Sequence, residues 1–158
     1  MDQLTPAQMR WAVVIIRTCR RSPLLHDDDH RARAADISLE VALAESSLTM
    51  YANGNNSTSL TLPHEAIGWD HGSVGLFQQQ VGGAPNSTAD WGTTRQCMNA
   101  AWSTARFLQD LCRQDWRTRS NWQLAQTVQH SADSSGGNYR RWDDLAIATR
   151  KRLWRSAR

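Results

Sequence analysis

Glu45 is the residue whose type and position most clearly permit chemistry. It is one of only three glutamates in the chain. Apolar residues recur at helical spacing around it, at Ile37, Val41, Ala44 and Leu48. At the edge of this stripe, partial burial favours the neutral acid and raises the carboxyl pKa, as a general acid needs near neutral pH. An ion pair between Glu45 and one of the many arginines is the structural alternative.

The other acidic residues also have structural interpretations. Asp70, in the segment GWDHGS, could hold and activate a water molecule across a cleft. A loop aspartate beside Gly72 more commonly bonds to the local backbone, however. Glu40 is expected on a different helix face from Glu45, and Glu65 is expected in a solvent-exposed loop.

The sequence predicts no metal site, no cofactor and no serine nucleophile. The segment 26–30, HDDDH, has some metal-ligand character, but helix capping accounts for its aspartates and its spacing matches no zinc or calcium motif. His64 and His71 lack partners at motif spacing. Ser46 and Ser73 lack a matching His and Asp arrangement, so we expect them to donate hydrogen bonds in a cleft.

Helices are expected to position these residues. One is predicted from Pro6 to about Arg20, and a second begins at the aspartates 27–29 and carries Glu45 near its C-terminal end. From 53 to 83 the composition shifts to Gly, Asn, Ser and Thr. This shift predicts a long irregular segment with a small hairpin around 59–62.

The C-terminal half continues the helical pattern. Apolar residues over 97–112 repeat at threes and fours, at Cys97, Met98, Ala101, Ala105, Leu108 and Cys112, and predict one long core helix. A shorter helix is predicted over 122–131, capped by Asn121. After the Gly136 and Gly137 pair, a last amphipathic helix begins near Trp142.

Composition indicates one folded domain, 1–158. A chain of 158 residues with 40% hydrophobic content can bury a real core. The net charge of +3 and the basic segment 150–158 favour an anionic partner, either nucleic acid or an acidic polymer such as a bacterial wall. The same charges could instead form a solvated helix end that complements the helix dipole. The eight Trp residues could pack the core or stack on sugars or bases.

The cysteines and the N-terminus bear on where the protein is made. Cys19, Cys97 and Cys112 show no CxxC spacing and no even count, so reduced, mostly buried thiols are expected. The apolar run 11–16 lacks the pattern of a signal peptide, and no apolar stretch approaches the ~20 residues that span a bilayer. We therefore expect a soluble product of the cytoplasm without membrane insertion, and any export would need another route.

Two segments resemble a known family. ALAESSL around Glu45 and IGWDHGSVGLFQQQ over 67–80 resemble the active-site motifs of lysozyme-fold peptidoglycan-cleaving enzymes. The likeness is strongest to soluble lytic transglycosylases and to the related domains of actinobacterial phage endolysins. ADWGTTRQCM over 89–98 and AQTVQHSADSSGGNY over 125–139 are similar to further elements of the family. The ES and GLFQ motifs are short, and it is their order over 41–142 that makes the match specific.

The resemblance implies a mainly α, lysozyme-like fold of the goose-type lysozyme and transglycosylase kind. A long loop or small β-hairpin would separate the catalytic helix from the GLFQ segment. It also implies that Glu45 is the catalytic residue. The substrate-binding or supporting residues would be Ser46, Asp70, Ser73, Gly75, Phe77, Gln78, Gln129 and Tyr139. The chain departs from the family pattern in its longer loop before GLFQ and in VQHSA, which replaces the more usual YNAG type of element.

Three functions follow as hypotheses. A lytic transglycosylase would cleave the peptidoglycan glycan strand with Glu45 as acid and then base, whereas a hydrolytic muramidase would use water, with Asp70 as a candidate base. The third is a non-catalytic module that binds the cell wall or nucleic acid. Bacterial peptidoglycan is the expected partner and nucleic acid is not, because no helix-turn-helix or RNA-binding motif is recognisable. The endolysin likeness implies a monomeric domain, alone or as one module of a larger lysin, that is made in the host cytoplasm and lyses the cell.

Overall fold

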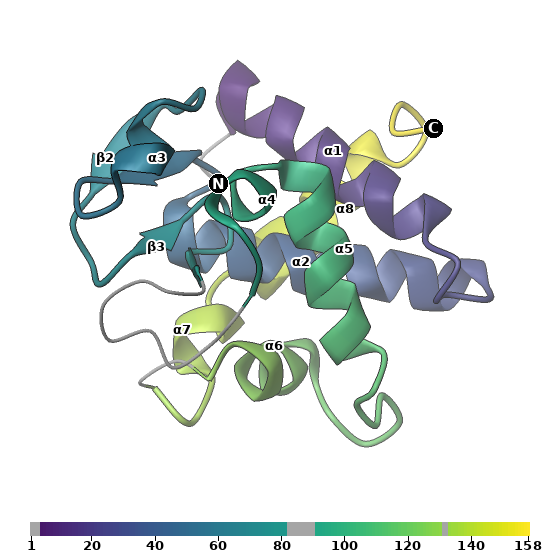
Figure 1. Ribbon diagram of the computed structural model, residues 1–158. Helices are drawn as coiled ribbons and strands as arrows, with labels where there is room; N and C mark the ends of the chain where they lie inside the picture. The colour runs from purple at the N-terminus through teal and green to yellow at the C-terminus, as the bar shows by residue number, and fades with distance from the viewer. Residues whose placement is uncertain (1–3, 82–90, 131–132) are drawn as a thin grey trace.

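The computed structural model describes residues 4–81, 91–130 and 133–158 and is mainly helical, which confirms the expected class (Figure 1). In chain order the elements are α1 (Pro6–Arg21), α2 (Asp28–Ser46), β1 (Tyr51–Asn53), α3 (Ser57–Leu60), β2 (Ala66–Gly68), β3 (Ser73–Val74), β4 (Gln79–Gln80), α4 (Thr94–Cys97), α5 (Ala100–Leu111), α6 (Asn121–Gln129), α7 (Gly137–Arg140) and α8 (Asp143–Leu153). Among the helices described, none has the length and apolar character needed to cross a membrane.

The first two helices begin where local capping predicts. The hydroxyl of Thr5 and the side chain of Gln8 form a capping box around Pro6, the first residue of α1. Asp27 caps α2, because its Oδ1 accepts the backbone N–H of His30 at 2.8 Å. Both starts agree with the prediction.

Helix α2 forms the centre of the fold and packs against α1, α5, α6, α7 and α8. Every residue from Ala34 to Leu43 is buried. The prediction that α2 buries a single apolar stripe is therefore wrong. A helix with neighbours on all sides is buried all round. Glu40, expected on a different helix face from Glu45, is 0% exposed. Leu48 lies beyond the helix end, with a left-handed backbone at φ 54°.

The segment between α2 and the GLFQ motif is more regular than predicted. Strands β1 and β2 pair in parallel, with Tyr51 opposite Ala66, and β3 and β4 form an antiparallel pair with Ser73 opposite Gln80. The hairpin expected around 59–62 is wrong because α3 occupies this place. Asn56 caps α3 by accepting the N–H of Ser59, a local bond that favours a helical turn over a strand. Figure 1 shows α3 and the strands together beside the C-terminal end of α2.

The long core helix predicted over 97–112 is two helices. Met98 and Asn99 separate α4 from α5, and Asn99 caps α5 by accepting the N–H of Trp102 at 2.9 Å. This new start rotates the buried face, so Ala101 and Ala105, expected in the core, are exposed. The buried residues of α5 are Ala100, Ser103, Thr104, Phe107, Leu108 and Leu111.

One residue of the basic C-terminal segment has a buried partner. Arg150 of α8 donates from Nε to Asp36 Oδ1 and from Nη2 to Asp36 Oδ2, each at 2.9 Å. The Asp36 side chain is only 7% exposed. This two-bond contact ties α8 to the middle of α2, so Arg150 is structural rather than part of a solvated basic surface.

Candidate active site

Three segments distant in the chain converge on Glu45, in the last turn of α2. The hydroxyl of Tyr139, from α7, donates to Glu45 Oε1 at 2.6 Å. The amide of Gln129, the last residue of α6, also acts on the Glu45 carboxyl and lowers its pKa. Gln129 Nε2 also donates to the carbonyl of Phe77 at 3.0 Å. The structure thus brings together Glu45, Gln129, Tyr139 and the backbone of the GLFQ motif.

The environment of Glu45 favours its neutral form. Burial raises the pKa of Glu45 above its ordinary value, and this is the largest effect. The hydrogen bonds from Tyr139 and Gln129 act in the opposite sense, and the negative charge of Asp70 raises the pKa further. Since Glu45 is only half-buried, its carboxyl can both keep a proton and exchange it with a ligand, as general acid–base chemistry requires.

Ser46 holds the GLFQ segment against the end of α2. Its hydroxyl is 2.8 Å from the carbonyl of Leu76 and 3.0 Å from that of Ala42, and the residue is 5% exposed. The hydroxyl is therefore engaged with backbone. Ser46 supports the site rather than presenting a donor to a ligand.

The GLFQ motif is held in place largely through its backbone. Gly75 has φ +78°, and a Cβ there would lie 2.3 Å from the carbonyl oxygen of Cys97. Gln78 also has a positive φ, of 47°, and its Nε2 donates to the Gly75 carbonyl at 3.0 Å. Glycine at 75 thus permits both the left-handed backbone and the close contact with Cys97.

The side chains of Phe77 and Ser73 face the interior. Phe77 is fully buried and its ring stacks on Phe107 with 5.4 Å between centroids. Ser73 is buried in β3, opposite Gln80. Their buried side chains anchor the β3–β4 hairpin to the core. The backbone carbonyl of Phe77, by contrast, accepts the hydrogen bond from Gln129.

Asp70 lies on the loop between β2 and β3 and makes the local contacts expected of a loop aspartate. Its side chain is 75% exposed and its Oδ1 contacts Nδ1 of the His71 ring, while its carbonyl accepts from Asn53 Nδ2 at 2.8 Å. These are the local bonds of a loop aspartate. Its negative charge contributes to the raised pKa of Glu45, after burial.

Two glutamates have structural surroundings that the sequence did not indicate. Glu65 Oε2 accepts from Trp11 Nε1 at 2.8 Å and from the N–H of Met50 at 2.9 Å, which fastens the loop before β2 to α1. Burial, and after it the facing carboxyl of Asp143, raises the pKa of Glu40 to about 10. Among the described residues, neither Glu40 oxygen has a hydrogen-bond partner. The long apolar run of α2 around Glu40 was the available signal of burial.

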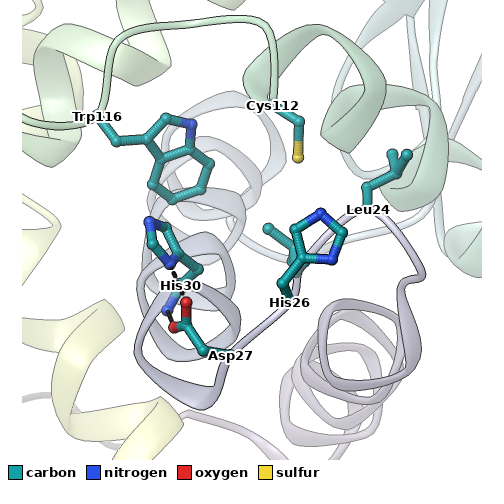
Figure 2. Close-up of a pocket in the computed structure, with 7 residues that line it drawn as sticks. Leu24, His26, Asp27, His30, Cys112 and Trp116 are labelled. Atoms are coloured by element: carbon teal, nitrogen blue, oxygen red, sulfur yellow. Dashed lines mark hydrogen bonds and ion pairs between the residues drawn. The ribbon is translucent and has the colours of Figure 1, made fainter.

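A pocket of about 200 Å³ lies near the N-terminal end of α2, away from Glu45 (Figure 2). It is lined by Leu24, Leu25, His26, Asp27, His30, Cys112 and Trp116. Asp27 is occupied with the His30 N–H and ring, and the His30 ring meets Trp116 edge-on. Within the described ranges, no group of three or more His, Cys, Asp or Glu residues could hold a metal ion.

No model of a known protein family matches the chain, and no curated protein matches it.

Proposed function

We propose that this protein cleaves the β-1,4 glycan strand of bacterial peptidoglycan between N-acetylmuramic acid and N-acetylglucosamine, as a lytic transglycosylase of lysozyme-like fold. The observation that carries the proposal is the half-buried Glu45 carboxyl, whose raised pKa has burial as its main cause. Its Oε1 accepts a hydrogen bond from the Tyr139 hydroxyl at 2.6 Å. The order of the ES and GLFQ motifs and of the segment with Gln129 and Tyr139 supports the same function.

Glu45 would act first as an acid and then as a base. The neutral carboxyl protonates the glycosidic oxygen, the bond to the muramic acid C1 breaks, and positive charge develops on that sugar. The Glu45 carboxylate then takes the proton of the muramic acid C6 hydroxyl, whose oxygen bonds to C1. The products are a 1,6-anhydro end and a new free hydroxyl, and no water is consumed. Tyr139 and Gln129 stabilise the carboxylate between the two steps.

A hydrolytic muramidase is the second candidate, and one observation favours it. Glycoside hydrolases ordinarily use a second carboxylate about 5 to 9.5 Å from the first, and Asp70 is the one acidic residue, among those that the structure describes, whose charge contributes to the raised pKa of Glu45. Asp70 would then activate water. Its exposure and its pairing with His71 favour the transglycosylase, which needs only Glu45.

The test is digestion of purified peptidoglycan in heavy-oxygen water by the wild type, Glu45→Gln and Asp70→Asn, with the fragment ends identified by mass spectrometry. We expect anhydro ends without solvent oxygen, a loss of roughly 10²–10⁴-fold in Glu45→Gln, and little effect of Asp70→Asn. Asp144→Asn, which removes an exposed acid on α8, is the matched control. Circular dichroism and thermal unfolding verify that each variant is folded.

Each other outcome would assign a different function to this protein. Reducing ends that carry heavy oxygen, together with loss of activity in Asp70→Asn, would establish the muramidase. Wall binding without Glu45-dependent fragments would indicate a non-catalytic cell-wall-binding module. The endolysin likeness extends the proposal to the biological setting: a monomeric lytic domain that is made in the infected host's cytoplasm and reaches the wall during lysis.

A further inference from the structure

We propose that Trp69 is a stacking platform for a sugar ring of the glycan strand, on the rim of the Glu45 site. This inference rests on the proposed function and adds a binding contact to it. Trp69 is 71% exposed, compared with 48% for Ile67, 44% for Leu24 and 39% for Leu60, the other large apolar residues exposed in the described parts. Tryptophan is highly buried on average, so a ring this open marks a surface suited to a ligand.

The ring is supported on one side by backbone. A Cβ on Gly54 would lie 2.3 Å from Cζ3 and 2.5 Å from Cε3 of Trp69, so the indole packs directly on a glycine. The N–H of Gly54 donates to the Gly68 carbonyl at 2.8 Å, and Asn55 Nδ2 donates to the Trp69 carbonyl at 3.1 Å. With the loop bonded in this way, less conformational entropy is lost when a ligand binds.

The platform belongs to the same site as Glu45. Trp69 lies on the loop before β3, and β3 leads into the GLFQ segment, whose Leu76 carbonyl accepts at 2.8 Å from Ser46, the residue after Glu45. Asn53 Nδ2 holds this loop in place through the carbonyls of Asp70, at 2.8 Å, and Ser73, at 3.1 Å. In Figure 1 β2 and β3, which flank the loop, lie beside the C-terminal end of α2, whereas α6 and α7, which supply Gln129 and Tyr139, lie below α2. A glycan chain bound at Glu45 can thus extend over Trp69.

The surroundings of Trp69 favour a sugar over other ligands. A pyranose ring presents an apolar C–H face that packs on an indole, while its hydroxyls point outward to polar groups and water. Polar residues adjoin Trp69: Asp70 and His71 follow it in the chain, and Asn55 donates to its carbonyl. Residues 51–81 contain no Lys or Arg, so this surface lacks the cations that nucleic acid or an anionic membrane would require.

The experiment uses Glu45→Gln protein so that the ligand is not cut. The probe is the β-1,4-linked tetrasaccharide of N-acetylglucosamine. Binding is measured by calorimetry and by the protection of tryptophan fluorescence from quenching by iodide. We expect Trp69→Ala to bind roughly tenfold more weakly and to lose the protection. Trp69→Phe should keep most of the affinity. Gly54→Ala should weaken binding because it displaces the ring without removing it.

Ile67→Ala is the matched control, since Ile67 is exposed, apolar and two residues before Trp69. It should bind like the parent protein. Equal weakening in Ile67→Ala and Trp69→Ala would mean general apolar adhesion and would overturn the stacking platform. Binding of Trp69→Ala at parental affinity, or no binding of the tetrasaccharide by the parent, would also overturn it.

Activity separates this inference from the proposed reaction. In protein with Glu45 intact, Trp69→Ala should raise KM for glycan strands and leave kcat close to the wild-type value, because stacking contributes equally to ground and transition states. An unchanged KM with normal cleavage would reject the platform and leave the reaction standing. Trp69-dependent binding without cleavage of any wall would reject the reaction and leave the platform standing.

Discussion

Glu45 and Tyr139 are 94 residues apart in the chain, and their side chains form a hydrogen bond of 2.6 Å. This bond favours the carboxylate, whereas burial favours the acid. Burial thus raises the pKa of Glu45, while the hydrogen bond from Tyr139 limits that rise by stabilising the charged form. Because one hydroxyl group opposes the effect of burial on the pKa of Glu45, removing that single oxygen atom tests its contribution.

Tyr139→Phe removes the donor and keeps the buried ring. Without it the pKa of Glu45 should rise further, because the lost hydrogen bond stabilised the charged form. The alkaline limb of the pH–rate profile, where Glu45 must still hold its proton, should move up by about one pH unit. Tyr51→Phe, at the other tyrosine of the chain, should leave the profile in place. An unshifted profile in Tyr139→Phe would show that the hydroxyl has no part in tuning Glu45.

At the scale of elements, the β3–β4 hairpin matters through its backbone. Its GLFQ residues place the Phe77 carbonyl against Gln129, 52 residues further along the chain, while Ser46 holds the Leu76 carbonyl at 2.8 Å. The backbone must pass close to Cys97 to do this. The hairpin therefore depends on a residue without a side chain at position 75.

Gly75→Ala should destabilise the fold by about 2 kcal/mol or more, since it combines a positive φ with a Cβ that meets backbone. Gly68→Ala is a matched glycine control: its Cβ would lie 3.6 Å from Tyr51 Cδ1, an ordinary contact. It should cost less than about 1 kcal/mol. Urea unfolding of both variants measures the difference, and equal stabilities would contradict the close approach at Gly75.

At the scale of the whole molecule, polar groups join the buried α2 to α6 and α8. Asp36 pairs with Arg150, and Arg33 Nε donates to Asn121 Oδ1 at 2.9 Å. Asn121 Nδ2 in turn donates to Asp143 Oδ1 at 3.1 Å. Glu40 faces this network from the core. A protonated Glu40 is compatible with burial there, whereas an ionised one would add an unpaired buried charge.

Glu40 should make the protein less stable as the pH rises. The unfolded chain loses this proton near its ordinary pKa of 4.5 and the folded protein near about 10. Between these values the unfolded state binds fewer protons, so the free energy of unfolding falls with pH across this window. Glu40→Gln and Glu40→Leu should both flatten this fall and be more stable than the wild type at pH 9, by at least about 1 kcal/mol. Thermal unfolding from pH 5 to 10 measures it, and parallel curves for all three proteins would refute the assignment.

The features that the sequence determined are local ones. The capped starts of α1 and α2, the place of Glu45 in the last turn of a helix and the mainly helical class all depend on residues within a few positions of one another. The grouping of Gln129 and Tyr139 with Glu45 came from motif resemblance, not from such patterns. Spacing by itself could not have placed side chains 94 positions apart in contact.

Only the tertiary structure decided what surrounds each element. The parallel pairing of β1 with β2, the buried face of α5, the immersion of Glu40 and the seat of Trp69 on Gly54 all differ from the sequence-based expectations or were absent from them. A periodic pattern shows which residues share a face, but burial depends on how many neighbours the chain returns to that face. For α2 the neighbours are α1, α5, α6, α7 and α8, and this enclosure buries Glu40 completely and Glu45 only in part.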